Sequence, residues 1–276
     1  MIDVKSLNIN WYPGHMKRTF DNLKEQLKIV DIIIEVRDAR IPMSSSNPLL
    51  NEITSNKPRL IILNKKDECD LDRTNKYLSS FEHVILTNAL NEKIDNIIVK
   101  EVKEILKDKL EKAKAKGIRH KVLRAAIVGI PNVGKSTIIN KVVKKNIAKT
   151  ENRPGVTKKL SWIKIHEDVE LLDTPGVLWP KIENPEVGVK LAILGSINDD
   201  ILDKQLLVNY ALDYLNENYH DKLVKRYGEI DTDKMLESIC RNMGWIKENN
   251  EIDLNKAYEI ILKDIRNNKI PNITWE

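Results

Sequence analysis

Short apolar runs alternate with stretches of helical spacing in the first part of the chain. The runs are rich in β-branched residues and are bounded by polar residues, Gly or Pro, which is typical of buried strands. They are Ile32–Val36, Leu60–Leu63, Val84–Leu86, Ala125–Val128, Trp162–Ile165 and Val169–Leu172. Strands that alternate with helices predict an α/β domain built on a mostly parallel sheet.

Apolar residues with helical spacing occur between the predicted strands and also after the last of them. Within the first part, Ile98, Val102, Ile105 and Ala113 fall near one face of a helix, and Ile138, Val142 and Val143 mark another. After about residue 185 the pattern predicts helices at Val187–Leu194, Ile201–Leu215, Lys234–Met243 and Leu254–Ile265. Pro180 and Pro185 bracket a linker. We therefore predict two domains, residues 1–182 and a small all-helical domain of residues 183–276.

Charge divides at the same point. The chain has 276 residues and a net charge of +5. Residues 1–182 hold 34 basic and 23 acidic residues, a net of +11, whereas residues 183–276 hold 12 and 18, a net of −6. Lys100–Arg124 is the densest basic stretch, with ten basic and four acidic residues. It is either a solvated helix face or a surface that contacts a phosphate backbone.

Composition excludes several classes of protein. Cys69 and Cys240 are the only cysteines, so a disulfide scaffold or a cysteine zinc site is excluded and a reducing compartment fits. No apolar run approaches the roughly 18 residues that a membrane span needs. The first residues lack the apolar core of a signal peptide. We expect a soluble, cytoplasmic protein with no membrane partner.

A phosphate-binding loop follows one predicted strand. Gly129–Ser136 fits the pattern GxxxxGK(S/T), after the strand Ala125–Val128 and before a predicted helix. Small residues let backbone N–H groups converge on phosphate oxygens, and the helix N-terminus adds a favourable dipole. Lys135 can reach the β- and γ-phosphates, and Ser136 can ligate Mg²⁺. The predicted nucleotide-binding residues of this loop are Asn132, Val133, Gly134, Lys135, Ser136 and Thr137.

Two further segments complete a phosphate and metal site. Asp173 ends the strand Val169–Leu172, where an acid suits Mg²⁺, and Gly176 can offer its N–H to a γ-phosphate. Between the two motifs, Thr157 could complete Mg²⁺ coordination when a third phosphate is bound, which would make this loop a switch. Thr150 is a weaker candidate for that role, and an ordinary loop is the alternative.

A third motif indicates which base the bound nucleotide carries. Asn64-Lys65-Lys66-Asp67 follows the strand Leu60–Leu63. The Asp67 carboxylate can accept two hydrogen bonds from the N1–H and the amino group of guanine, a donor pair that adenine lacks. We expect Asn64 to brace the neighbouring loops and the Lys65 stem to cover the base. Backbone donors for the base oxygen could come from Thr87, Asn88 and Ala89, which follow the next strand.

The order of these motifs resembles that of the circularly permuted GTPases of the YlqF/YawG type. In ordinary small GTPases the phosphate loop precedes the NKxD motif, whereas here the motif at residue 64 precedes the loop at residue 129. Other matching segments are Trp11–Met16, Asp38–Pro42, Pro154–Thr157 and Asp173–Pro180. The similarity covers nearly the whole chain and implies a P-loop GTPase fold with circular permutation, followed by a helical domain.

The resemblance also implies an activity and its partners. It implies a monomeric GTPase that uses GTP and Mg²⁺ and acts on a precursor of the large ribosomal subunit and its ribosomal RNA. Val177 stands where many GTPases place a water-orienting Gln, and the resemblance assigns that role to His15. His15 anchoring the N-terminal loop or touching RNA is the alternative. Asn132 is implied to hold K⁺ beside the phosphates, which could stabilise transition-state charge.

Several alternatives stay open at this point. A nucleotide-gated RNA-binding or protein-binding module with negligible turnover would also fit Val177, and Asn64 and Asp67 argue against an ATPase or kinase. A family member could act in tRNA modification or small-subunit assembly instead. In the acidic helical domain, Lys222, Lys225 and Arg226 beside Tyr219 and Tyr227 form either an RNA-binding patch or a plain helix surface.

Overall fold

The computed structural model describes residues 9–10, 23–54, 56–143, 161–174, 176, 181–198 and 202–276. The chain divides into two compact units. The sheet unit comprises Tyr12–Asp67, Leu71–Pro180 and Glu276, and the helical unit comprises Met1–Trp11, Glu68–Asp70 and Lys181–Trp275. Each unit contains more than one stretch of chain, and the single boundary at 182/183 stays a prediction.

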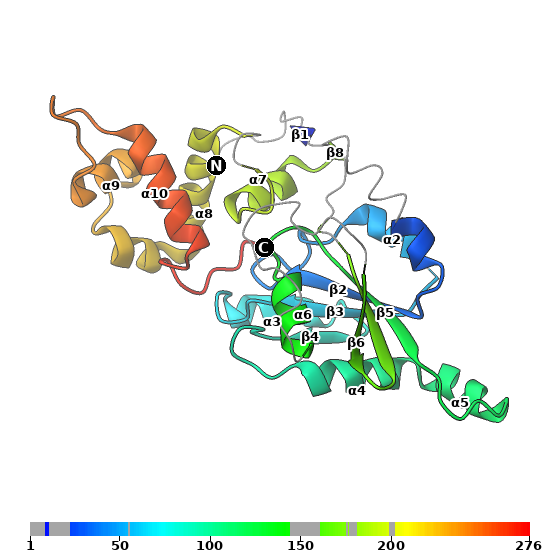
Figure 1. Ribbon diagram of the computed structural model, residues 1–276. Helices are drawn as coiled ribbons and strands as arrows, with labels where there is room; N and C mark the ends of the chain where they lie inside the picture. The colour runs from blue at the N-terminus through cyan, green and yellow to red at the C-terminus, as the bar shows by residue number, and fades with distance from the viewer. Residues whose placement is uncertain are drawn as a thin grey trace. The chain divides into compact units, whose positions relative to one another are not determined.

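The sheet unit is built on six strands, of which five are parallel (Figure 1). Their order is β4-β3-β2-β5-β7-β6, and β6 pairs antiparallel with β7. The bounds are β2 Ile32–Asp38, β3 Arg59–Asn64, β4 Val84–Leu86, β5 Leu123–Val128, β6 Ser161–His166 and β7 Val169–Asp173. The predicted α/β fold and all six strands are confirmed, most of them one or two residues longer than the apolar runs indicate.

The central strands lie in the core because helices cover the sheet. All seven residues of β2 are buried, as expected for a parallel strand covered on both faces. One core cluster packs Leu23 and Leu27, from a short helical turn before β2, against strand residues such as Ile33, Ala126 and Leu172. This packing fixes the strand ends from which the loops of the site emerge.

Within the described residues, five helices connect these strands. They are α2 Pro48–Thr54, α3 Leu71–Leu78, α4 Asp95–Ile105, α5 Lys107–Ala115 and α6 Lys135–Val142. The periodicity through Ile98 and Ala113 predicts one helix, but the structure breaks it at Leu106, where φ is −99° and ψ is 17°. Ile98 and Val102 anchor α4, whereas Ala113 is the one buried residue of α5. The second half therefore lacks an apolar stripe long enough to hold it in line with the first.

The described part of the helical unit contains four α-helices and a two-stranded ribbon. The ribbon pairs β1 Ile9–Asn10 with β8 Lys181–Ile182. The helices are α7 Pro185–Ile193, α8 Lys204–Tyr227, α9 Met235–Met243 and α10 Leu254–Arg266, with the 3₁₀ turn η2 Thr232–Lys234 before α9. Asn184, Asp203 and Asp253 cap the first turns of α7, α8 and α10 by accepting backbone N–H bonds. The four predicted helices are present, and α8 runs 12 residues beyond Leu215 through a non-helical Tyr219.

No helix in the described part of the chain is both long and apolar enough to cross a membrane.

Candidate nucleotide-binding site

The loops that carry the predicted motifs meet at one edge of the sheet. Parallel strands end at the same edge, and a ligand crevice is expected where the strand order reverses. Here that point lies between β2 and β5, because the chain passes outward from β2 to β4 and returns to β5 beside β2. Asp38, Asn64 and Asp173 each end a parallel strand, with Asp38 directly opposite Asn64.

The phosphate loop depends on two glycines whose backbone φ angles are positive. A Cβ on Gly129, at φ +152°, would lie 2.4 Å from the carbonyl oxygen of Val36. A Cβ on Gly134, at φ +94°, would lie 2.2 Å from Nδ2 of Asn64. Gly134 is also the N-cap of α6 and, being a glycine, makes no side-chain cap hydrogen bond. The loop thus leads directly into the N-terminus of a helix, the arrangement that suits an anion.

Lys135 and Asp173 are both buried beside this loop and act on each other electrostatically. The Lys135 Nζ donates hydrogen bonds to the carbonyl oxygens of Gly129 at 3.1 Å and Ile130 at 3.0 Å. Burial lowers the Lys135 pKa to about 8, against the opposing effect of Asp173. Burial raises the Asp173 pKa to about 6, against the opposing effect of Lys135. A Cβ on Gly176 would lie 3.1 Å from the Lys135 Nζ, so the segment after β7 reaches the phosphate loop.

Asn64 joins three loops. Its Nδ2 donates to the carbonyl oxygen of Val133 in the phosphate loop at 2.9 Å. Its Oδ1 accepts from the backbone N–H of Ala89, after β4, at 3.0 Å. The side chain is buried, so both bonds are shielded from water. The expected bracing is present: the loops after β3, β4 and β5 are connected through one side chain.

Lys65 is held by Asp38, the first residue of the segment Asp38–Pro42. Its backbone has φ +66°, and its Nζ donates to Oδ2 of Asp38 at 2.8 Å. Arg40 also donates to Asp38, from Nε at 3.0 Å and from Nη2 at 2.8 Å. Burial alone would raise the Asp38 pKa, but the Arg40 guanidinium and the Lys65 ammonium outweigh it and hold the pKa well below its usual range. In the sequence, the feature that could have indicated this role is the position of Asp38, an acidic residue at the end of a buried strand.

Glu92 fixes the loop after β4. Its carboxylate accepts from the Lys66 Nζ at 2.7 Å, the Thr87 Oγ1 at 2.7 Å and the Asn88 backbone N–H at 3.1 Å. These bonds hold the Glu92 pKa below its ordinary value, the Lys66 bond above all. No sequence signal marked this residue, because its role depends on two loops that only the fold brings together.

The remaining predicted residues divide into two groups. Ser136 and Thr137 stand in the first turn of α6, and Asp67 is exposed in the turn after Lys66. His15 and Thr157 lie outside the described residues, as do Thr150 and Val177. The assignments of His15 and Thr157 therefore stay predictions.

Most residues of the basic cluster predicted in the helical unit are buried or bound to other residues of that unit. Tyr219 and Tyr227 are only 7% and 1% exposed, so neither can stack on a base. Arg226 pairs with Asp264 at 2.7 Å, and the Lys222 Nζ donates to the carbonyl oxygen of Asn272 at 2.7 Å. These contacts favour the plain helix surface over the RNA-binding patch.

Comparisons with known proteins agree with this geometry. Residues 124–241 match the family model described as 50S ribosome-binding GTPase. Ribosome biogenesis GTPase A of Bacillus pumilus is 44% identical, over 98% of this chain and 99% of its own length. Mitochondrial ribosome-associated GTPase 1 of Mus musculus is 35% identical, over 91% of this chain and 78% of its own length. The structure of GNP-bound YlqF from T. maritima is 26% identical, with a TM-score of 0.65 over 94% of this chain and 97% of that one.

Proposed function

This chain belongs to the ribosome biogenesis GTPase A family, and from that premise we propose that it binds GTP, hydrolyses it to GDP and phosphate, and acts in assembly of the large ribosomal subunit. The partners are a precursor of that subunit and its ribosomal RNA, and the protein is cytoplasmic and monomeric when off the ribosome. The observation that carries the proposal is the bridge made by Asn64 between the phosphate loop and the two loops expected to hold the base.

Base selection falls to the segment after β3. Asp67 accepts from the two adjacent donors of guanine, and the Lys65 stem covers the ring while Asp38 holds its Nζ. In this structure the backbone N–H groups of Asn88 and Ala89 donate to Glu92 and to Oδ1 of Asn64, so either group would have to share its hydrogen with the base oxygen. GTP and GDP should therefore displace a bound fluorescent guanine nucleotide at concentrations where ATP does not.

The loop after β5 and the end of strand β7 bind the phosphates and the metal. Lys135 leaves the carbonyl oxygens of its own loop for the β- and γ-phosphates, which replace them as acceptors for its Nζ. The hydroxyl of Ser136 and the carboxylate of Asp173 are hard oxygen donors, and with Thr157 they fit Mg²⁺. Bound Mg²⁺ would neutralise charge on the β- and γ-phosphates. Gly176 offers its N–H to the γ-phosphate.

Two further residues are assigned to the attacking water and to a monovalent cation. Val177 cannot accept or donate a hydrogen bond, and we assign orientation of the attacking water to His15. Wild-type turnover by His15→Ala with ribosomal subunits present would refute that role. Asn132, at φ +63°, is assigned to K⁺ beside the phosphates. Equal turnover in K⁺ and in Na⁺ would refute it.

Depletion in the source organism tests the role in assembly. We expect incomplete large subunits to accumulate in sucrose-gradient profiles while small subunits stay normal. Re-expression of the wild-type chain should restore the profile, whereas Lys135→Ala, which lacks the phosphate-binding ammonium, should not. An unchanged profile after depletion would contradict the proposed function.

A further inference from the structure

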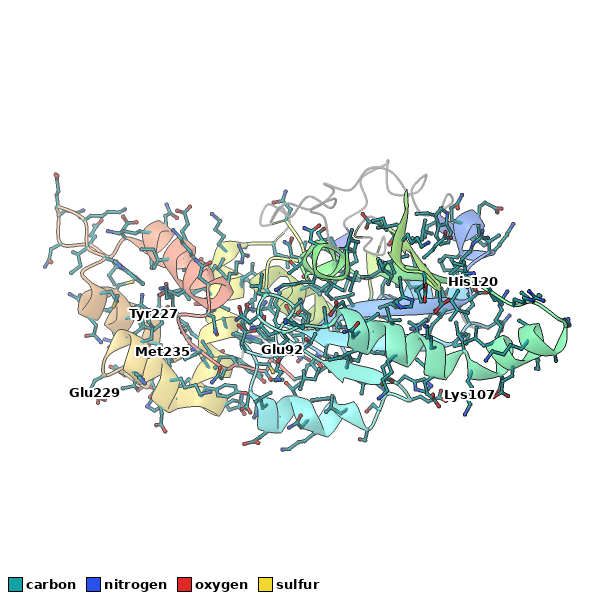
Figure 2. The ribbon with its side chains drawn as sticks, turned by 60° about the horizontal axis from the view of Figure 1, so that its bottom comes forward. Glu92, Lys107, His120, Tyr227, Glu229 and Met235 are labelled. Atoms are coloured by element: carbon teal, nitrogen blue, oxygen red, sulfur yellow. The ribbon has the colours of Figure 1, made fainter. Side chains whose placement is uncertain are left out.

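The most basic part of the molecule lies away from the nucleotide site. Residues 107–124, which we call the basic projection, comprise α5, the loop that leads into β5 and the first two residues of β5. They hold eight basic and two acidic residues, a net of +6, which exceeds the +5 of the whole chain. In Figure 1, α5 extends beyond the end of the sheet, and in Figure 2 the labelled Lys107 and His120 lie at its base.

The base of the projection is fixed to the sheet unit. Lys109 forms an ion pair with Asp31, which also accepts the backbone N–H of Arg124 at 2.9 Å. His120 lies 2.9 Å from Asp168, and Ala113 is buried. The rest of α5 and the turn after it are almost wholly exposed. The projection is therefore an anchored element with a free outer part.

Four exposed cations of the outer part have no ionic partner among the described residues. They are Lys112, Lys114, Lys116 and Arg119, and no carboxylate in the described ranges lies within 4.0 Å of them. Lys112 and Lys116 are four residues apart, so they lie on the same side of the helical turn and repel each other. This concentration of like charge is unfavourable in the free protein, and a polyanion would relieve it.

The composition of the projection indicates which polyanion fits. It contains no Phe, Trp or Tyr, and its one His, His120, lies 2.9 Å from Asp168 at the base, so the outer part has no aromatic ring on which unpaired bases could stack. Ile118 is its one exposed large apolar side chain, too little to enter a lipid surface. Lysine and arginine without aromatic partners contact phosphates and do not read sequence. Such contacts suit an RNA helix, whose deep major groove hides its base edges.

We propose that the basic projection binds the phosphate backbone of double-stranded RNA, through Lys112, Lys116 and Arg119. The identity of that RNA as ribosomal rests on the proposed function, whereas the binding chemistry does not. The surface is separate from the nucleotide site, since none of these residues contacts the phosphate loop or the loops joined by Asn64. It would give the sheet unit an RNA contact that the acidic helical unit does not supply.

Binding of the full-length protein to an RNA duplex of about 20 base pairs, measured over a series of salt concentrations, tests the proposal. The triple variant Lys112→Gln, Lys116→Gln, Arg119→Gln should bind at least about tenfold more weakly at low salt, with a salt slope smaller by about three. Its intrinsic GTP hydrolysis and its thermal midpoint should equal those of the wild type, because the three side chains are exposed.

The matched control removes three charges elsewhere. Lys24, Lys76 and Lys256 are exposed and make no ion pair among the described residues, and their triple change to Gln should leave duplex binding close to wild type. Equal loss in both variants, or no loss in either, would overturn the proposal, as would wild-type binding to anionic lipid vesicles but not to the duplex. Co-sedimentation of the wild-type protein with large ribosomal subunits tests the proposed function separately. If the wild type binds the RNA duplex but not the subunit, the result contradicts the proposed function and leaves the RNA-binding proposal intact.

Discussion

At the scale of single residues, the site is held by side chains that join loops. Asn64 can approach the phosphate loop closely only because position 134 is a glycine, and the two residues are therefore coupled across the sheet edge. Asp38 plays a similar part for Lys65, with two cations converging on one buried carboxylate. In both cases an interaction between distant residues sets the local geometry of a motif.

Gly134→Ala should weaken GTP binding by at least about 100-fold, because the new Cβ would displace Asn64 and shift the phosphate loop. Gly117→Ala is the matched control, since Gly117 has a similar φ of +79° but no atom within 4 Å of the new Cβ. Both changes carry the backbone strain of a positive φ, about 1 to 2 kcal/mol. Fluorescent nucleotide titration should find wild-type affinity in Gly117→Ala, and equal affinities in the two variants would contradict the coupling.

Asp38→Asn should lower the free energy of unfolding at pH 7 by about 3 kcal/mol, because it leaves the buried Arg40 without its counter-charge. The pKa of Asp38 is lower in the folded state than its unfolded value of 3.8, so its stabilisation is present above about pH 4. It is lost as the pH falls toward the folded pKa. Denaturant unfolding should therefore give a constant difference between wild type and variant from pH 7 to pH 5.

Below about pH 4, the difference in the free energy of unfolding between the wild type and Asp38→Asn should become smaller as the pH falls. Asp72→Asn, at an exposed position in the first turn of α3, is the control and should cost less than about 1 kcal/mol. A difference for Asp38→Asn that stays constant down to pH 3 would show that the carboxylate charge does not stabilise the fold.

At the scale of elements, the sequence predicts what depends on neighbours along the chain. The apolar runs locate all six strands, and a polar or charged residue at a strand end locates the loops of the site, as at Asn64 and Asp173. The break at Leu106 was missed because it reflects loss of packing on α5, which periodicity does not register. Glu92 was missed because its three donors come from loops that the sheet brings together.

Glu92→Gln should weaken GTP binding about three- to tenfold, because the charge-assisted bond from Lys66 is lost and the loop after β4 loosens. We expect KM to rise while kcat stays unchanged, since Glu92 braces the base-binding loop without touching the phosphates. Glu104→Gln, at an exposed position on α4, is the control. Steady-state hydrolysis gives both constants, and a loss in kcat alone would contradict this role.

At the scale of the whole molecule, two units of opposite charge share one chain. The net of +11 in residues 1–182 is concentrated in the basic projection, and the net of −6 in residues 183–276 includes carboxylates that pair internally, such as Asp264. The strand order places the phosphate loop at the centre of the sheet although three strands and the NKKD motif precede it in the chain, as expected from the circular permutation. The motifs predicted the nucleotide site without indicating which unit meets RNA.

The most direct test of the central claim is the rate of GTP hydrolysis with and without purified large ribosomal subunits. A GTPase that acts in assembly of this subunit should turn GTP over slowly by itself and at least about tenfold faster with subunits present. Lys135→Ala should show neither rate. Hydrolysis that is undetectable in both conditions, or equal with and without subunits, would contradict the account.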